Sequence, residues 1–418
     1  MKRLMTWFSS LPSHYRIALV PGLVALVCTL YIIWQGLTLP GIHPGFADKD
    51  FANYWTAGKL ILAGRTADLF GPHAIYFAHL TEAFGPDFPW HNWSYPPHYL
   101  LLVWPLGLFG YKTAMMLFLG LTGAFFIWAA RAFGERDNIM VWVAIIPFVA
   151  HNLWVAQNGF LFAGCALSAL ALRDNRPLLA GVFLGLLTIK PQLGVFFPFL
   201  LLAERRWLVI ASAAATTFFL VGLSAAIFGV DAWRGYLADV IPYQAFVMRE
   251  LQGTFLAMLT SIYGMLRNWG SSADTALALH LVVAVPAAVI TIAAFFLGRS
   301  DRDRSVLLLV ATFVVTPYAL TYDLGLLTGA LALLANSRFG QSNRTGLPIA
   351  LSMLLPVIMM PLGEAHVTIA PPLIMIMFVM ALANTGAWER LRGTSYAGAG
   401  QSHPPQRQVD PAAAFEQR

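Results

Sequence analysis

Long apolar runs separated by short polar joints dominate the chain, and this pattern predicts an all-α polytopic membrane protein. A helix rises about 1.5 Å per residue, so about 20 residues cross the hydrocarbon core of a bilayer. The candidate spans are residues 17–37, 112–131, 139–152, 155–172, 177–190, 192–204, 207–229, 275–297, 305–317, 320–335, 346–362 and 367–385. Several of these runs are short, so the expected number of transmembrane helices is about twelve.

The distribution of lysine and arginine predicts one orientation in the membrane. With both termini in the cytoplasm, most of the 26 basic residues fall on the cytoplasmic side, in joints such as those at Arg173, Arg205 and Arg302. No small-residue cleavage pattern follows the first run, which we therefore expect to be retained as a helix. The expected location is the plasma (inner) membrane, and the scattered basic residues are better explained by topology than by nucleic-acid binding.

Two longer polar segments, about residues 38–111 and 230–274, are predicted to lie outside the membrane. In the first, the stretch from Pro97 to Gly110 is too short to span, so we expect a helix at the outer surface. In the second, the sequence predicts an amphipathic helix around residues 233–240 and a short helix from Thr254 to Leu266. Residues 1–392 would then form one transmembrane domain, followed by a disordered cytoplasmic tail, 393–418, rich in Gly, Pro, Gln and Ala.

Composition narrows the functional classes further. Hydrophobic residues make up 58% of the chain and charged residues 11%, and the mean hydropathy is +0.66, which excludes a water-soluble domain. The chain has no GxxxxGK[ST], HExxH or GxSxG motif, so ATP hydrolysis, zinc proteolysis and serine hydrolysis have no support. The two cysteines lie in apolar runs and offer neither a disulfide framework nor a cysteine metal site. No cofactor is predicted.

The predicted topology places at the external face the polar residues that could take part in catalysis or binding. Placing a charged side chain near the hydrocarbon core costs free energy unless an opposite charge or water compensates it, so such residues indicate function. An active site facing the periplasm or exterior would need this arrangement. The residues are Asp48, Asp50, His91, His98, Gln157, Asn158, Lys190, Gln192, Arg249, Tyr322, Asp323, Glu364 and His366.

Asp50 is the candidate general base. It precedes a helix that we expect to begin near Phe51 and to carry Asn53 and Tyr54. An aspartate in this position either caps the helix, by accepting backbone N–H bonds, or takes a proton from an attacking hydroxyl. Asp48 could hold a divalent metal ion or orient Asp50, or it could be a surface charge.

The run HNWSYPPH, His91 to His98, combines aromatic rings with a rigid double proline. Rings such as Tyr95 can stack on a sugar beside groups that hydrogen-bond its hydroxyls, although anchoring at the membrane interface explains the aromatic residues equally well. Gln157 and Asn158 lie at a turn between two spans, where amides either cap a helix or contact a substrate.

Lys190, in the run LLTIKPQ just before Gln192, lies at the outer end of a predicted span. Its ammonium group either binds an anion such as a phosphate or extends to the lipid headgroups. Arg249 either forms a surface ion pair with Glu250 or binds a phosphate in a bidentate manner. Asp323, next to Tyr322, is expected to be functional or paired with a partner, because acids inside spans are rare.

Taken in order, several motifs resemble glycosyltransferase family 87, a group of the GT-C superfamily that includes polyprenol-phosphate-mannose-dependent α-1,2-mannosyltransferases. The motifs are DFANYWTAGKLILAG from Asp50, Tyr95 to Pro97, the turn AQNGF, the run from Ala180 to Pro191, and RRW at Arg205 to Trp207. The resemblance covers most of residues 40–335. The family commonly has glycine where this chain has Ala156.

The resemblance implies a GT-C fold and an inverting transferase that moves a hexose, often mannose, from a polyprenyl-monophosphate donor at the outer half of the membrane. In such enzymes the aspartate after the first span is the base, which corresponds to Asp50. Basic residues hold the donor phosphate, and Lys190 and Arg249 are the candidates by position. The acceptor would be a glycolipid or a glycan. Two alternatives remain open: a transporter or flippase of lipid-linked glycans, and an oligosaccharide polymerase or ligase that uses a diphosphate donor.

Overall fold

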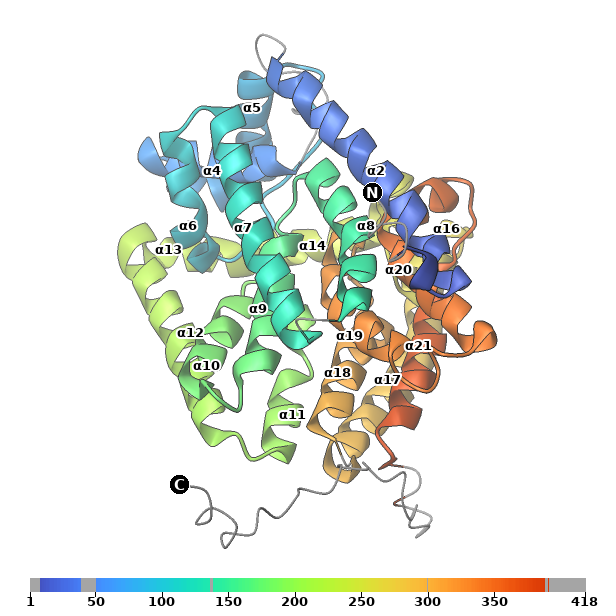
Figure 1. Cartoon of the computed structure of the whole chain (residues 1–418). Helices are drawn as coiled ribbons and strands as arrows, with labels where there is room; N and C mark the ends of the chain where they lie inside the picture. The colour runs from blue at the N-terminus through green and yellow to red at the C-terminus, as the bar shows by residue number, and fades with distance from the viewer. Residues whose placement is uncertain (1–7, 39–49, 136–137, 299, 388–389, 391–418) are drawn as a thin grey trace, which may run out of the picture.

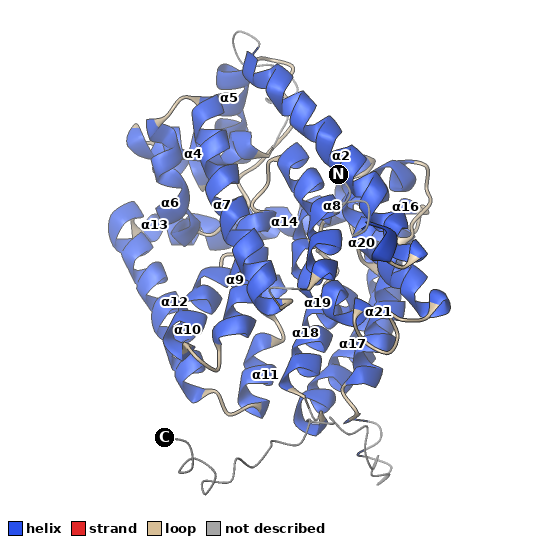
Figure 2. Ribbon diagram, viewed as in Figure 1, coloured by secondary structure: helices blue, strands red, loops and turns tan. Residues whose placement is uncertain are grey.

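The computed structural model describes residues 8–38, 50–135, 138–298, 300–387 and 390, in which helices joined by loops make up the regular structure (Figure 2). The extended pairing in this part of the chain is a single bridge between Leu259 and Leu320. The predicted all-α class is therefore confirmed.

A helix corresponds to each of the twelve predicted spans. Among the described residues, five helices are long and apolar enough to cross a membrane by themselves: α2, α7, α12, α17 and α20. Crossing by the shorter helices stays a prediction. The bounds are α2 (Ser13–Thr38), α7 (Tyr111–Phe133), α8 (Ile139–Val155), α9 (Gly159–Leu172), α10 (Pro177–Leu187), α11 (Phe197–Ala203), α12 (Trp207–Phe228), α17 (Ala273–Leu297), α18 (Asp301–Val315), α19 (Gly325–Ala335), α20 (Asn343–Glu364) and α21 (Ala370–Asn384) (Figure 1).

An ion-pair network joins three of the basic joints that the charge pattern predicts on one side. Arg173 Nε lies 2.8 Å from Glu204 Oε2, and Arg304 Nη2 lies 3.8 Å from Glu204 Oε1. Arg173 Nη2 also donates to the backbone carbonyl of Asp301 at 3.0 Å. The Glu204 side chain is 1% exposed, so its carboxylate needs these cations as partners. The network lies at the lower end of the molecule, near α11 and α18 (Figure 1).

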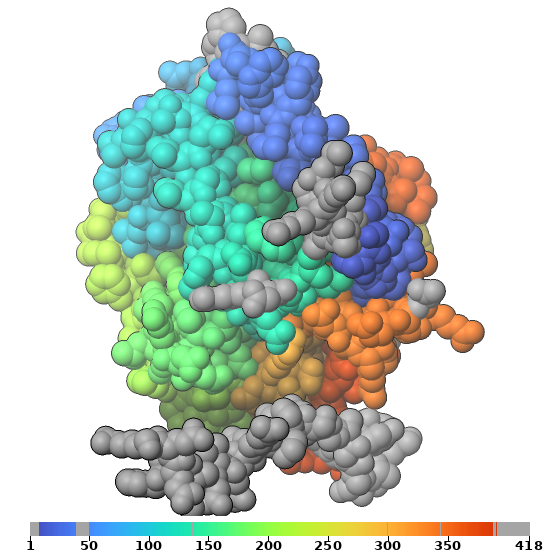
Figure 3. All heavy atoms as spheres, in the orientation of Figure 1, coloured from blue at the N-terminus to red at the C-terminus, as the bar shows by residue number. Residues whose placement is uncertain are grey.

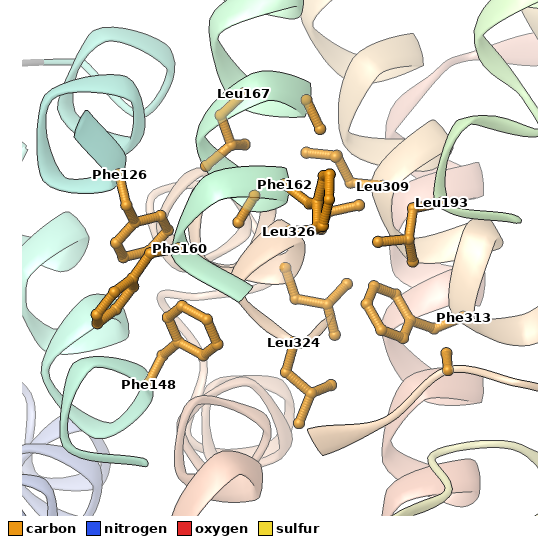
Figure 4. Close-up of a cluster of buried hydrophobic side chains, with 14 of the residues drawn as sticks. Phe126, Phe148, Phe160, Phe162, Leu167, Leu193, Leu309, Phe313, Leu324 and Leu326 are labelled. Atoms are coloured by element: carbon orange, nitrogen blue, oxygen red, sulfur yellow. The ribbon is translucent and has the colours of Figure 1, made fainter. Parts of the chain in front are cut away.

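Small residues and aromatic side chains pack the helices together. A Cβ added at Gly181 would lie 2.4 Å from Ser212 Cβ, and one at Gly185 would lie 2.5 Å from Thr216 Cβ. This glycine pair, four residues apart, lets α10 approach α12 closely, as small residues do between membrane helices. Elsewhere the core is built from rings and leucines, among them Phe126, Phe148, Phe160, Phe162, Leu309 and Phe313 (Figure 4).

The first predicted external segment folds into short helices above the bundle. They are α4 (Phe51–Leu62), η1 (Thr66–Leu69), α5 (His73–Phe84), η2 (Pro97–Tyr99), α6 (Leu100–Val103) and η3 (Trp104–Leu108). The start of α4 at Phe51 agrees with the prediction. The backbones of α4 and η3 touch, since a Cβ at Gly58 would lie 2.7 Å from the backbone nitrogen of Gly107.

The second predicted external segment contains α13 (Val230–Gly235), η5 (Tyr236–Val240), α14 (Ile241–Glu250), α15 (Thr254–Met258) and α16 (Ile262–Asn268). The single helix expected from Thr254 to Leu266 is wrong, because two helices occupy this range. Between them, Thr260 N donates to the Ala319 carbonyl at 3.0 Å, and Ser261 Oγ donates to the Pro317 carbonyl at 2.7 Å. These bonds replace helical ones and attach the segment to the loop between α18 and α19.

Candidate active site

A cavity of about 710 Å³ lies where the two predicted external segments meet the α8–α9 turn and the loop between α18 and α19. We call it the central cavity. Asp50 and Asn53 of α4 line it, together with side chains from α14, α15 and α20. Its other lining residues include Trp90, His91, Ser94, Tyr95, Trp154, Gln157, Gln244, Thr254, Tyr318, Tyr322 and Met360. Segments far apart in sequence therefore build one chamber with both polar and apolar walls.

Asp50 occupies the N-cap position of α4, but its side chain makes no cap hydrogen bond. The carboxylate is 26% exposed, and its Oδ1 lies 3.6 Å from Nε2 of His91. The other ring nitrogen of His91 lies 2.9 Å from the Pro89 carbonyl. Because a carbonyl can only accept, His91 Nδ1 carries a proton and Nε2 faces Asp50. The capping interpretation of Asp50 is therefore wrong, and the carboxylate points into the cavity beside an imidazole.

A hydrogen-bonded cluster of tyrosines and an amide lies behind Asp50. The hydroxyls of Tyr54 and Tyr95 are 3.0 Å apart, and Tyr54 also donates to Gln157 Oε1. The backbone N–H of Asn158 donates to the same Gln157 oxygen at 2.7 Å. Burial, followed by the neighbouring Tyr95, raises the pKa of Tyr54 well above its usual value. The Tyr54 phenol therefore stays neutral and adds no charge next to Asp50, while Tyr95 lines the central cavity.

Lys190 lines a second hollow of about 380 Å³, which we call the lysine pocket. Gln192, at the start of the short helix η4 (Pro191–Gly194), lines it as well. The lysine pocket adjoins the central cavity, because the same residues line both: Ser94, Tyr95, Gln244, Tyr318 and Tyr322. Asp50 and Lys190 therefore open into neighbouring spaces that tyrosine side chains separate.

Lys190 is held by Asp323. Its Nζ lies 2.8 Å from Asp323 Oδ1 and 4.5 Å from the centre of the Tyr322 ring. The other carboxylate oxygen, Asp323 Oδ2, accepts from the backbone N–H of Leu320 at 3.1 Å. The Lys190 side chain is 7% exposed, so it does not extend to lipid headgroups. Asp323 is the paired acid that the sequence led us to expect.

An apolar groove continues from the lysine pocket. We call it the α10–α12 groove; it has a volume of about 270 Å³, and Leu184, Leu187, Phe197 and Ala213 are among its lining residues. Pro191 lines both the groove and the lysine pocket. A hydrocarbon chain could therefore lie in the groove while its polar end reaches Lys190.

The structure brings some of the other predicted site residues to these hollows and leaves others outside. Asn53, His91, Tyr95, Gln157 and Tyr322 line the central cavity. Tyr54, Asn158 and Asp323 are buried beside it and act through hydrogen bonds or ion pairing. Asp48 lies outside the described residues. Among the described residues, no cluster of three or more His, Cys, Asp or Glu side chains is arranged to hold a metal ion.

Arg249 does not lie at the site, contrary to the expectation from sequence. Its Nη2 lies 2.7 Å from Asp274 Oδ1, and the side chain is 52% exposed. Val247 and Leu251 of the same segment line the central cavity. Residues four apart share one helix face, so the residue midway between them faces away from the cavity.

His98 is also displaced from the site. It is 3% exposed, and its ring stacks on Trp233 with centroids 5.6 Å apart. Its Nδ1 has no hydrogen-bond partner. Burial lowers the pKa of His98 from 6.5 to about 4. His98 is thus a packing residue of the first external segment and is neutral at physiological pH.

This lowered pKa predicts a loss of stability in acid. Between the two pKa values of His98, the unfolded chain takes up a proton that the folded protein does not, so stability falls as the pH drops from about 6.5 towards about 4. The expected loss between about pH 7 and about pH 5 is about 2 kcal/mol. Thermal unfolding of the detergent-solubilised protein across this range measures it. His98→Gln should flatten the dependence, and equal pH slopes in both proteins would contradict the assignment.

The sequence analysis did not single out several residues that line the central cavity. Gln244 lies on the second external segment, and its Nε2 donates to Ser94 Oγ at 2.9 Å, which ties that segment to the first. Tyr318 lies in the TPYALTYDL run beside residues that were considered. A polar residue in an external amphipathic helix was the available signal for Gln244, but its partner is 150 residues away in the chain.

The fold is that of a polytopic helical membrane protein. Its central cavity contains the Asp50 carboxylate, and the adjoining lysine pocket contains the Lys190 ammonium group. The sequence profile of glycosyltransferase family 87 matches residues 93–320 of the 418. The chain belongs to this family and is therefore a membrane glycosyltransferase. The GT-C superfamily, which the motifs led us to expect, is consistent with this family. No curated protein and no solved structure matches the chain. Asp50 precedes the matched range, so the family assignment alone does not give it a role.

Proposed function

We propose that the protein transfers a hexose, with mannose as the expected sugar, from a polyprenyl-monophosphate donor to an acceptor hydroxyl. The acceptor is a glycolipid or a glycan, and transfer takes place with inversion on the external side of the plasma membrane. The observation that carries the proposal is the adjoining pair of hollows. One presents the uncapped Asp50 carboxylate and the other presents Lys190.

In the proposed reaction, Asp50 accepts the proton of the acceptor hydroxyl. The acceptor oxygen forms a bond to the anomeric carbon from the face opposite the phosphate, and the bond from that carbon to the phosphate oxygen breaks. The bonding electron pair leaves with the polyprenyl phosphate, whose charge Lys190 stabilises. Orientation of the two reactants and stabilisation of the leaving group supply most of the rate enhancement, and the general base contributes about 10²- to 10⁴-fold.

The charge balance of the lysine pocket supports a monophosphate donor over a diphosphate one. Among the described residues, Lys190 is the single Lys or Arg that lines the central cavity or the lysine pocket, and Asp323 already compensates part of its charge. A sugar linked through one phosphate carries one negative charge, whereas a diphosphate carries more. Burying the additional charge without further cations would be costly. The α10–α12 groove, which starts at this pocket, offers apolar space for the isoprenoid chain.

Reconstituted protein tests the proposal. Proteoliposomes are incubated with labelled polyprenyl-monophosphate mannose or with a polyprenyl-diphosphate-linked glycan, each together with a membrane glycolipid extract. Mass spectrometry should detect new hexosylated products with the monophosphate donor. Product from the diphosphate donor alone would favour a polymerase or ligase. Movement of the intact donor between leaflets, without any covalent product, would favour a flippase.

A further inference from the structure

A second, largely apolar groove adjoins the central cavity and shares no lining residue with the lysine pocket. It has a volume of about 300 Å³ and lies between α2, α8 and α20. We call it the α2–α20 groove; Cys28 and Ile32 line it from α2, Ala150 from α8, and Val357 from α20. The function proposed above does not use it.

The α2–α20 groove is continuous with the chamber that contains Asp50. Trp154 at the end of α8 and Met360 near the end of α20 line both the groove and the central cavity. Neither residue lines the lysine pocket. A molecule whose tail lies in this groove would therefore present its polar end to the central cavity, which Asp50 also lines.

The helix α2, which lines one side of the groove, has a wide apolar surface beside it. On α2, Val24 is 58% exposed, Val27 66% and Trp34 59%, so this helix presents a wide apolar surface outside the groove. Both α2 and α20 are among the helices long and apolar enough to span a membrane. In the space-filling view, α2 runs along the outside of the molecule beside the orange C-terminal segments (Figure 3). If these helices span the bilayer, as their length and composition allow, the groove lies beside a lipid-facing surface.

Charge distinguishes this groove from the one beside Lys190. Among the described residues, no Lys or Arg lines it; His151 and the acid Glu364 do. His151 Nε2 lies 2.8 Å from Thr321 Oγ1, and Glu364 Oε1 accepts a hydrogen bond from Thr254 Oγ1 at 3.2 Å. Thr254 in turn lines the central cavity. A carboxylate at this position repels a phosphate and accepts hydrogen bonds from sugar hydroxyls, so the groove suits the tail of a lipid with a neutral glycan head rather than the donor.

We propose that the α2–α20 groove binds the hydrocarbon chains of the acceptor, and that the acceptor is therefore a membrane-anchored glycolipid. This inference rests on the proposed function, because it assigns the second substrate of the same site. Donor and acceptor chains then enter from two different helix pairs, and their polar ends meet across the tyrosines between Lys190 and Asp50.

Photocrosslinking tests the groove without requiring transfer. The probe is dodecyl α-mannoside with a diazirine in its chain, added to the full-length protein in lipid nanodiscs, and the labelled peptides are mapped by mass spectrometry. Labelling is expected on α2, α8 and α20, with displacement by unmodified dodecyl mannoside. Labelling confined to α10 and α12, displacement by phosphatidylcholine alone, or displacement by polyprenyl phosphate would overturn the assignment.

Two matched pairs of variants sharpen the test. Cys28 is an exposed residue inside the groove, and its neighbour Val27 is exposed but outside it. Cys28→Trp should reduce labelling about 10-fold, equivalent to about 1.4 kcal/mol, whereas Val27→Trp should not. On α12, Ala214→Trp fills the α10–α12 groove and Ala215→Trp does not. Both α12 variants should leave labelling by the mannoside unchanged.

Transfer assays separate this inference from the proposed function. With polyprenyl-monophosphate mannose as donor, dodecyl α-mannoside should be a better acceptor than methyl α-mannoside, and Cys28→Trp should remove the advantage. Equal use of both acceptors, unaffected by Cys28→Trp, would overturn the groove and leave the transferase intact. Displaceable labelling of the groove in a protein that transfers from no donor would support glycolipid binding there and overturn the proposed function.

Discussion

Asp50→Asn is expected to reduce hexose transfer by about 10²- to 10⁴-fold while donor binding is unchanged. The amide has nearly the shape of the carboxylate but cannot accept a proton at neutral pH. Since the Asp50 side chain makes no cap hydrogen bond, the substitution removes little from the start of α4. Its contact with His91 is long, at 3.6 Å, which also limits the structural cost.

Steady-state transfer from labelled polyprenyl-monophosphate mannose measures this effect, with donor binding followed separately by equilibrium titration. Asp87→Asn is the matched control, because Asp87 lies on the same external segment, is exposed and lines neither hollow. Unfolding temperatures of the two variants should agree with that of the unmodified protein. Normal turnover by Asp50→Asn would remove Asp50 from the mechanism.

Lys190→Met is expected to reduce both donor affinity and stability. The substitution leaves the Asp323 carboxylate, 2% exposed, without its cation, and breaking such a buried pair costs about 3–5 kcal/mol. It also removes the positive charge that we propose for the donor phosphate. A hydrogen bond to a charged group is worth about 1.5–3 kcal/mol, so donor affinity should fall about 10- to 100-fold.

The double variant Lys190→Met/Asp323→Asn separates the two effects. The neutral asparagine leaves no unpaired buried charge, and its side-chain oxygen can still accept the backbone N–H of Leu320, so the unfolding temperature should recover. Transfer should not recover, because no cation faces the phosphate. If activity returned together with stability, the pair would be a packing element of the α10–α19 region and not part of the donor site.

Ala156, in the turn between α8 and α9, has a backbone conformation that favours glycine. Ala156, which stands where the family commonly has glycine, adopts a left-handed conformation with φ 52° and is 1% exposed. This conformation costs a residue with a Cβ about 1–2 kcal/mol, whereas glycine adopts it freely. A glycine at position 156 would therefore relieve strain in this turn.

The sequence by itself determined the helical membrane class, the positions of the long helices and the family. These depend on local hydrophobic periodicity, on charged joints and on motif order, all of which are read along the chain. It also singled out Asp50, Lys190 and Asp323, because charged residues beside apolar runs are rare whatever the fold.

Only the tertiary structure decided which of these residues face one another. Arg249 and His98 are as polar as the residues that line the hollows, but helix phase turns the first away and packing against Trp233 buries the second. The Lys190–Asp323 pair spans 133 residues, and the bond between Gln244 and Ser94 spans 150. Contacts over such separations depend on the packing angles of several helices, and no local pattern encodes those angles.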